Sequence, residues 1–237
     1  MQDYFKAREP GTNIFNNLPV ARPGIPFIII AGLLFLLCLA LDWCWARNFF
    51  FVLTLFVAWF FRDPQRPTPP EGFGLSPADG RVIKVEHLAD NPYTNGPAKR
   101  VSIFMNVFNV HVNRAPVSGR LAAQTYFPGK FFNADLDKAS QDNERNALVL
   151  ETEEGRVAVV QIAGLIARRI VSWVGEGEEL KRGQRFGMIR FGSRLDLYLP
   201  PDSKIMVTLG QKVSAGWSPV WQPAEAPQQA PAELPRD

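Results

Sequence analysis

The sequence predicts a mainly β protein, in which a membrane-associated α-helical hairpin precedes a barrel-sandwich-like β domain. Three observations lead to this prediction. Two uncharged apolar runs lie close together near the N-terminus. Short segments rich in β-branched residues fill residues 72–216, and Gly, Pro and Asn-Gly separate them. Toward the C-terminal end of that region, the glycines are spaced as in tight β-hairpins.

Composition excludes several classes of protein. The chain has 237 residues, a net charge of +3 and only two cysteines, Cys38 and Cys44, so neither a disulfide framework nor a cysteine-rich zinc site is expected. The two histidines, His87 and His111, are too few for a multi-histidine metal centre, and we expect no metal. The charge is too mild to indicate a nucleic-acid partner, but it suits an anionic membrane surface.

A polar segment, residues 1–24, precedes the apolar hairpin, residues 25–61. The hairpin contains uncharged runs of seventeen residues, Ile25–Leu41, and thirteen residues, Phe49–Phe61. A membrane-spanning helix needs about 20 apolar residues, with a lower limit near 17. We therefore expect a hairpin that enters the bilayer or makes two tight spans. A buried core hairpin is the alternative interpretation.

Basic residues lie outside both ends of this hairpin, at Lys6, Arg8, Arg22, Arg62 and Arg66. Positive charges stay preferentially on the cytoplasmic side of a membrane. The pattern predicts that both ends of the hairpin lie at the cytoplasmic face of the cell membrane.

The remaining boundaries follow from proline. Residues 62–71 form a proline-rich linker that cannot continue a helix, and residues 72–216 form the predicted β-rich domain. Residues 217–237 contain five prolines among alanines and glutamines, which predicts a disordered tail.

Five segments together carry a family resemblance. They read FFRDP (60–64), LSPADG (75–80), NVHVNRAPVSG (109–119), GLIARRIV (164–171) and FGS (191–193). Each is weak alone. In this order, across residues 10–216, the sequence resembles the short form of the phosphatidylserine decarboxylase proenzymes.

The Gly192-Ser193 pair, read alone, is the turn of a β-hairpin. The resemblance implies that the chain cuts itself between Gly192 and Ser193, and that Ser193 becomes a covalent pyruvoyl group, so that pyruvate is the cofactor. Residues 1–192 and 193–237 then form a heterodimer, and a higher homo-oligomer is also allowed.

The implied reaction is loss of CO₂ from phosphatidylserine to give phosphatidylethanolamine. The pyruvoyl ketone forms a Schiff base with the substrate amine and accepts the electrons that CO₂ leaves behind. Two alternatives remain: a pyruvoyl-dependent decarboxylase of another amino-group substrate, or a non-enzymatic membrane-anchored carrier or scaffold of lipoyl-like fold. A carrier needs a lysine where this chain has Gly192-Ser193.

Four other residues complete the predicted site. Asp79 is either a turn aspartate or, as the resemblance implies, a residue that orients a base during self-cleavage. His111 is either a strand histidine or the acid–base group. Arg168 and Arg169 are either surface charges or ligands of the substrate phosphodiester, with only one facing the site if they lie in a strand.

The sequence departs from the long-form members of the family at two positions. Long forms carry a His-x-x-His pair where this chain has His111 and Arg114, and a hydroxyl residue where it has Arg194. The resemblance therefore leaves open which base activates Ser193.

Overall fold

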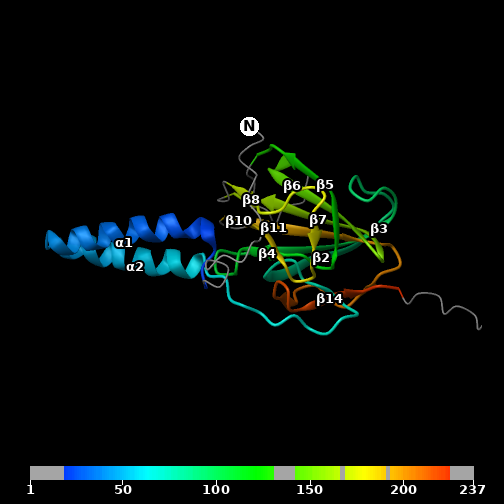
Figure 1. Ribbon diagram of the computed structural model, residues 1–237, viewed down its shortest axis with the longest axis horizontal. Coiled ribbons are helices and arrows are strands. Elements are labelled where there is room, and N and C mark those ends of the chain that lie inside the picture. The colour runs from blue at the N-terminus through cyan, green and yellow to red at the C-terminus, as the bar shows by residue number, and fades with distance from the viewer. Residues whose placement is uncertain (1–18, 131–141, 166–168, 191–192, 225–237) are drawn as a thin grey trace, which may run out of the picture.

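The computed structural model describes residues 19–130, 142–165, 169–190 and 193–224. A helical hairpin projects from one end of a β domain (Figure 1). A 3₁₀ turn, η3 (Arg22–Gly24), leads into α1 (Ile25–Ala40), and α2 (Cys44–Phe60) runs back beside it. Pro26 occupies the first turn of α1, where its missing N–H leaves no intrahelical bond unmade. The predicted combination of a helical hairpin and a mainly β domain is confirmed.

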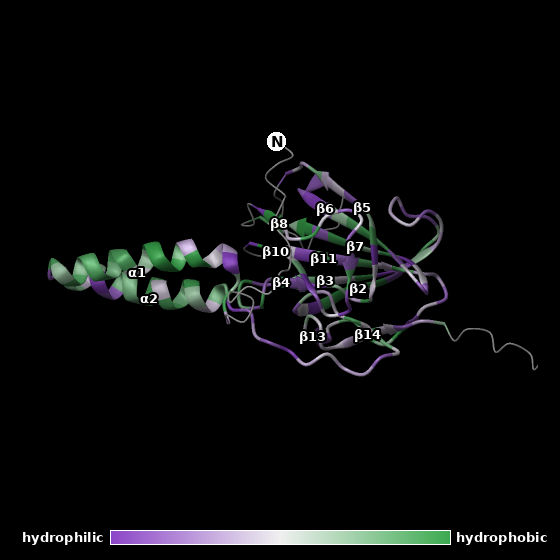
Figure 2. Cartoon of the chain, viewed as in Figure 1, coloured by the Kyte–Doolittle hydropathy of each residue, from purple (hydrophilic) through white to green (hydrophobic). Residues whose placement is uncertain are grey.

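Figure 2 shows that both helices of the hairpin consist mostly of apolar residues, and many of their large side chains are exposed. Residues Arg22–Ala40 are long and apolar enough to cross a membrane, whereas α2 is shorter. At the tip, Trp43 and Trp45 are 60% and 91% exposed. Since the helices bury little of this surface against each other or the β domain, the alternative of a buried core hairpin is wrong.

An eight-stranded antiparallel sheet forms the main layer of the β domain, in the order β13-β2-β3-β11-β7-β6-β5-β9. Its strands are β2 (Gly80–Leu88), β3 (Ala98–Met105), β5 (Gly119–Phe127), β6 (Arg145–Thr152), β7 (Gly155–Ala163), β9 (Glu179–Leu180), β11 (Ser193–Leu199) and β13 (Lys212–Val213). β11 is buried along its whole length and lies between β3 and β7.

Two three-stranded sheets complete the domain. One has the order β4-β10-β8, from β4 (Val112–Arg114), β10 (Arg185–Ile189) and β8 (Ile170–Ser172). The other has the order β1-β14-β12, from β1 (Gly74–Leu75), β14 (Pro219–Gln222) and β12 (Lys204–Ile205). Residues 63–70, in the predicted linker, contain neither helix nor strand.

The predicted start of the disordered tail, at residue 217, is too early in the chain. Pro219–Gln222 is a strand, and Val220 and Trp221 are fully buried in the main core. Gly74 makes this possible, because a Cβ at residue 74 would lie 1.8 Å from the indole nitrogen of Trp221. Residues 225–237, the rest of the predicted tail, lie outside the described ranges.

A second apolar cluster joins the hairpin to the β domain. It contains Ala21, Phe60 and Phe61 from the hairpin and Val110, Val112 and Met188 from the domain. Phe27 of α1 stacks on Phe61 with ring centroids 5.7 Å apart. The Ala21 amide also donates to the Phe61 carbonyl at 2.7 Å, so the base of the hairpin is closed and fixed against the domain.

Candidate active site

Ser193 is the first residue of β11 and lies in the centre of the main sheet. It is opposite Met105 of β3 on one side and Ala163 of β7 on the other. Its side chain is fully buried, and its hydroxyl has no hydrogen-bond partner among the described residues. A buried polar group without a partner is unfavourable and frequently marks a functional position. Gly192, the other half of the predicted cut, lies outside the described ranges.

His111 lies in a loop, not in a strand. The predicted continuous β segment is interrupted at residues 106–111, between β3 and β4, because Asn106 and Asn109 form a turn: the Asn109 side chain accepts the Asn106 amide at 2.9 Å. After this turn the His111 ring packs against Phe60 of α2, with ring centroids 4.4 Å apart.

The buried imidazole of His111 is held in its neutral form. Burial lowers its pKa from 6.5 to about 4, and the positive charge of Arg62 acts in the same direction. The Asn109 backbone and the Asp79 carboxylate oppose this shift only in part. Neither ring nitrogen makes a well-formed hydrogen bond within the described part of the chain. The ring is therefore unprotonated at neutral pH, which is the form that a proton acceptor must have.

Strand register brings Ser193, His111 and Arg169 to one end of the β domain. Ser193 opposite Met105 places it where β3 leads into the His111 loop. The Ile189 amide donates to the His111 carbonyl at 3.4 Å, and the Arg190 amide donates to the Arg169 carbonyl at 3.2 Å. Figure 1 shows β4, β8, β10 and β11 on the side of the domain that faces the hairpin.

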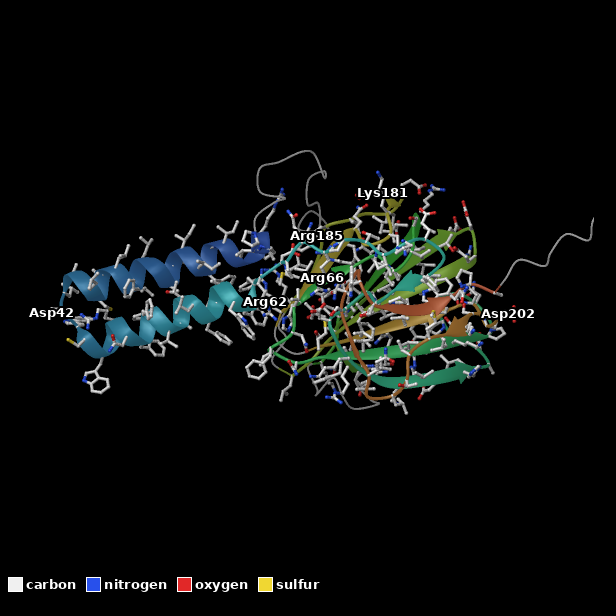
Figure 3. All side chains as sticks on the ribbon, turned by 90° about the horizontal axis from the view of Figure 1, so that it is seen from below. Asp42, Arg62, Arg66, Lys181, Arg185 and Asp202 are labelled. Atoms are coloured by element: carbon white, nitrogen blue, oxygen red, sulfur yellow. The ribbon has the colours of Figure 1, made fainter. Side chains whose placement is uncertain are left out.

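Asp79 accepts hydrogen bonds from Arg66 and from the backbone of Ala215. Both carboxylate oxygens accept from Arg66, at 2.5 Å and 2.8 Å, and one also accepts the Ala215 amide at 2.8 Å. Asp79 therefore holds the linker onto the domain. It acts on His111 through its charge, since no described hydrogen bond joins the two side chains. Figure 3 shows Arg62 and Arg66 where the hairpin meets the domain.

Arg114 has a structural role at the position where long forms carry a second histidine. It is buried, lies 3.2 Å from Asp63 Oδ1, and donates to the Pro64 carbonyl at 2.9 Å. Asp63 also pairs with Arg185 at 2.6 Å. Burial and the nearby Arg185 charge lower the pKa of Arg114, while Asp63 raises it. These residues belong to the family motifs, but their role could not be predicted, because charge pairing between distant segments leaves no local signal in a sequence.

A network of buried side-chain amides lies beside the site, and the sequence alone did not predict it. Gln161 Nε2 donates to Asn113 Oδ1 at 2.8 Å, and Asn146 Nδ2 donates to Gln161 Oε1 at 3.0 Å. Asn113 in turn donates to the sulfur of Met105, the residue opposite Ser193, at 3.7 Å. Connected buried amides of this kind fix side-chain positions, so the network anchors the strands that flank Ser193.

The predicted pair of substrate-binding arginines is described only in part. Arg169 directly precedes β8 and is exposed, whereas Arg168 lies outside the described ranges. His87 is exposed in β2. A cavity of about 650 Å³ is lined by Glu71, Arg120, Glu151, Glu179, Arg182 and Trp221, among others. It does not contain Ser193 or His111, so we separate it from the site.

Comparison with known proteins identifies the class and then the family. Residues 53–220 match the family model for phosphatidylserine decarboxylase. A phosphatidylserine decarboxylase proenzyme of Syntrophus aciditrophicus is 53% identical over 204 residues, which cover 85% of this chain and 96% of the relative. Proteins of the same name from Ralstonia nicotianae and Burkholderia lata are 52% and 53% identical, over 86% and 83% of this chain and 95% and 92% of theirs.

The fold, the buried serine and these matches define an enzyme of the carboxy-lyase class. The chain belongs to the phosphatidylserine decarboxylase family, and its relatives are named as proenzymes. The family resemblance seen in the sequence is confirmed, and neither of the two alternative functions is favoured.

Proposed function

We propose that this chain is a proenzyme that cuts itself before Ser193 and then decarboxylates phosphatidylserine to phosphatidylethanolamine. The observation that carries the proposal is the Ser193 hydroxyl, which is buried and unpartnered among the described residues at the start of a central strand. Family membership and the relatives' names supply the substrate.

The cut needs only groups of this chain and water. Ser193 Oγ attacks the Gly192 carbonyl carbon and loses its proton to a base, the C–N bond breaks, and the Ser193 nitrogen takes up a proton. The resulting ester loses the Ser193 α-proton and expels the Gly192 carboxylate, which leaves a dehydroalanine. Water then adds, ammonia leaves, and a pyruvoyl group remains. No electrons are gained or lost overall.

His111 is the proposed proton acceptor. Its neutral imidazole lies at the same end of the domain as Ser193, and Phe60 shields it from water. A neutral base in an apolar pocket takes a proton from a hydroxyl without first losing one of its own. We propose the same ring as the acid that later protonates the decarboxylated product. Asp79 is proposed as a positioning residue, which holds Arg66 and the linker beside this ring.

The cofactor fits the site because its carbon skeleton is that of Ser193. A pyruvoyl ketone at this position would supply an electron sink for the loss of CO₂ from a substrate that carries an amine. The buried walls of β3 and β7 surround this position and limit access of water to it. The two pieces, residues 1–192 and 193–237, form the proposed heterodimer.

The hairpin is proposed to hold the enzyme at the cytoplasmic face of the cell membrane. Its exposed apolar side chains, tryptophan-rich tip and basic flanks support this location. A diacyl lipid is nearly insoluble in water, so an enzyme that acts on its headgroup benefits from attachment at the interface. Arg169 is proposed to contact the substrate phosphodiester there, and Arg168 keeps the same proposed role.

Denaturing electrophoresis with mass spectrometry tests the proposal. The wild type should give two pieces, of 192 and 45 residues by division of the 237-residue chain, and the smaller should begin with a blocked α-keto group at position 193. Ser193→Ala should remain one inactive chain. Ser203→Ala is the matched control, because Ser203 is also a buried serine whose hydroxyl has no described partner, and it should be cut normally. An active wild type that stays uncut would overturn the proposal.

A further inference from the structure

Arg190 lies at the seam between the hairpin and the β domain. It directly follows β10 and precedes Ser193 by three positions. Its guanidinium stacks over the ring of Phe27, near the start of α1, with its carbon 5.3 Å from the ring centroid. Its Nε atom is buried and makes no hydrogen bond to any described residue.

Among the described residues, a second cation and no acidic group acts on the charge of Arg190. Burial and the positive charge of Arg169 lower its pKa, and no described acidic group opposes them. Other buried arginines of the domain differ in this respect: Arg114 pairs with Asp63, and Arg194 pairs with Asp196. A partly buried cation is stabilised when an anion binds to it. Arg190 therefore offers a buried N–H donor and a positive charge to an anion from outside the described residues.

We propose that Arg190 and Arg169 together bind the phosphodiester of the phospholipid substrate, and that Phe27 of the hairpin forms one wall of this subsite. The inference rests on the proposed function and adds a residue and a second structural element to its site. Two guanidinium groups suit a phosphodiester, because each presents parallel N–H donors to the phosphate oxygens.

The position of Arg190 agrees with the chemistry of the substrate. Three residues of chain span at most about 10 Å, so the Arg190 backbone lies within that distance of position 193. In a phosphatidylserine headgroup only a few bonds separate phosphorus from the amine. An arginine side chain can therefore hold the phosphate while the amine meets the reactive carbon. The hairpin then has a second role besides attachment, since it shapes the subsite.

Steady-state kinetics of Arg190→Gln in neutral-detergent mixed micelles tests this inference, with the mole fraction of phosphatidylserine as the variable. Loss of a charged hydrogen-bonding group should raise KM about 10-fold or more, while kcat stays within about 2-fold. Arg190→Lys, which keeps the charge but loses the fork, should give an intermediate KM. Arg156→Gln removes an equal charge from an exposed position at the start of β7 and should match the wild type. An unchanged KM in Arg190→Gln overturns the proposal.

A second arm separates the substrate from anionic lipid in general. Binding of Arg190→Gln to phosphatidylcholine vesicles containing phosphatidylglycerol should equal that of wild type. Weakened vesicle binding in proportion to KM would replace the proposed subsite with a general surface contact. Phe27→Leu should raise KM less than Arg190→Gln, and no rise would remove Phe27 from the subsite.

The small piece of each variant is also weighed by mass spectrometry. Normal cutting in Arg190→Gln shows that the variant folds and that any KM effect belongs to the subsite. Arg190→Gln that stays uncut while wild type is cut would overturn the subsite. An uncut wild type contradicts the proposed function instead, whatever Arg190 does.

Discussion

Arg194 and Asp196 form a bidentate ion pair in which both side chains are completely buried. Nε lies 2.6 Å from Oδ1, and Nη2 lies 3.0 Å from Oδ2. Arg194 also donates to Ser102 Oγ of β3 at 3.0 Å. Because Arg194 directly follows Ser193, these contacts fix the start of β11 where the cut is proposed.

Breaking this pair should destabilise the precursor. Arg194→Met, in a Ser193→Ala background that keeps the chain whole, leaves Arg100, 4.0 Å away, as the one described cation within ion-pair distance of Asp196. Removing one partner of a buried pair lowers the free energy of unfolding by about 3–5 kcal/mol. Urea unfolding in detergent measures it. Arg156→Met breaks an exposed pair with Glu151 and should change stability by less than about 1 kcal/mol. Equal effects of the two variants would contradict this view.

The His111 pKa predicts a specific pH dependence. The folded-state value, about 4, is below the ordinary 6.5, so the folded form resists protonation. The contribution to stability is therefore complete above about pH 6.5 and declines as the pH falls toward 4. Nuclear magnetic resonance of ring-labelled histidine in a His87→Gln variant should show a titration midpoint near 4. A midpoint at 6 or above would mean that water reaches the ring.

The same measurement tests how Asp79 acts. Its carboxylate raises the pKa of His111, so Asp79→Asn should move the titration midpoint of His111 lower. The variant also loses charged hydrogen bonds from Arg66, which contribute about 1.5–3 kcal/mol each. We therefore expect slower self-cleavage together with lower stability. A variant that is less stable but has an unchanged midpoint would leave Asp79 with a purely structural role.

Restoring the long-form histidine should not help this enzyme. Arg114→His loses the contacts with Asp63 and the Pro64 carbonyl that hold the linker. We expect the free energy of unfolding to fall by about 2 kcal/mol and self-cleavage to be no faster than in the wild type. Gel densitometry of newly made protein measures the rate of cleavage. Faster cutting would show that position 114 takes part in the proton transfer.

Charges on the outside of the hairpin should release the protein from membranes. Leu33 and Leu36 are 59% and 54% exposed in α1. Their joint replacement by Asp is unfavourable by about 2.5–3.5 kcal/mol for each residue near the middle of a spanning helix. Vesicle flotation should show the loss. Leu209→Asp, at an exposed leucine of the β domain, is the control and should remain bound. Flotation of the double variant at the wild-type level would exclude hairpin insertion.

Local sequence patterns predicted much of the fold. Each of these elements could be predicted from residues that are close together in the sequence: the helices from the apolar runs, the linker from its prolines and the strands from the β-branched segments. The family motifs indicated Ser193 and His111. The His111 loop was missed, because the asparagine turn sits inside a run that reads as a strand. The order of Pro219–Gln222 depends on Trp221 entering a core built by distant residues. The pairs of Asp63 and Asp79 join segments that only the tertiary fold brings together.

The central place of β11 has a consequence for assembly. Once the proposed cut is made, residues 193–237 still contribute β11, a central strand of the eight-stranded sheet. They also contribute β14, the middle strand of the sheet β1-β14-β12. The shorter piece is thus interwoven with the longer one and cannot leave without dismantling both. Two separately synthesised halves would have to build this architecture without their covalent tether. Synthesis as a single polypeptide therefore allows both pieces to fold together before the proposed cut separates them.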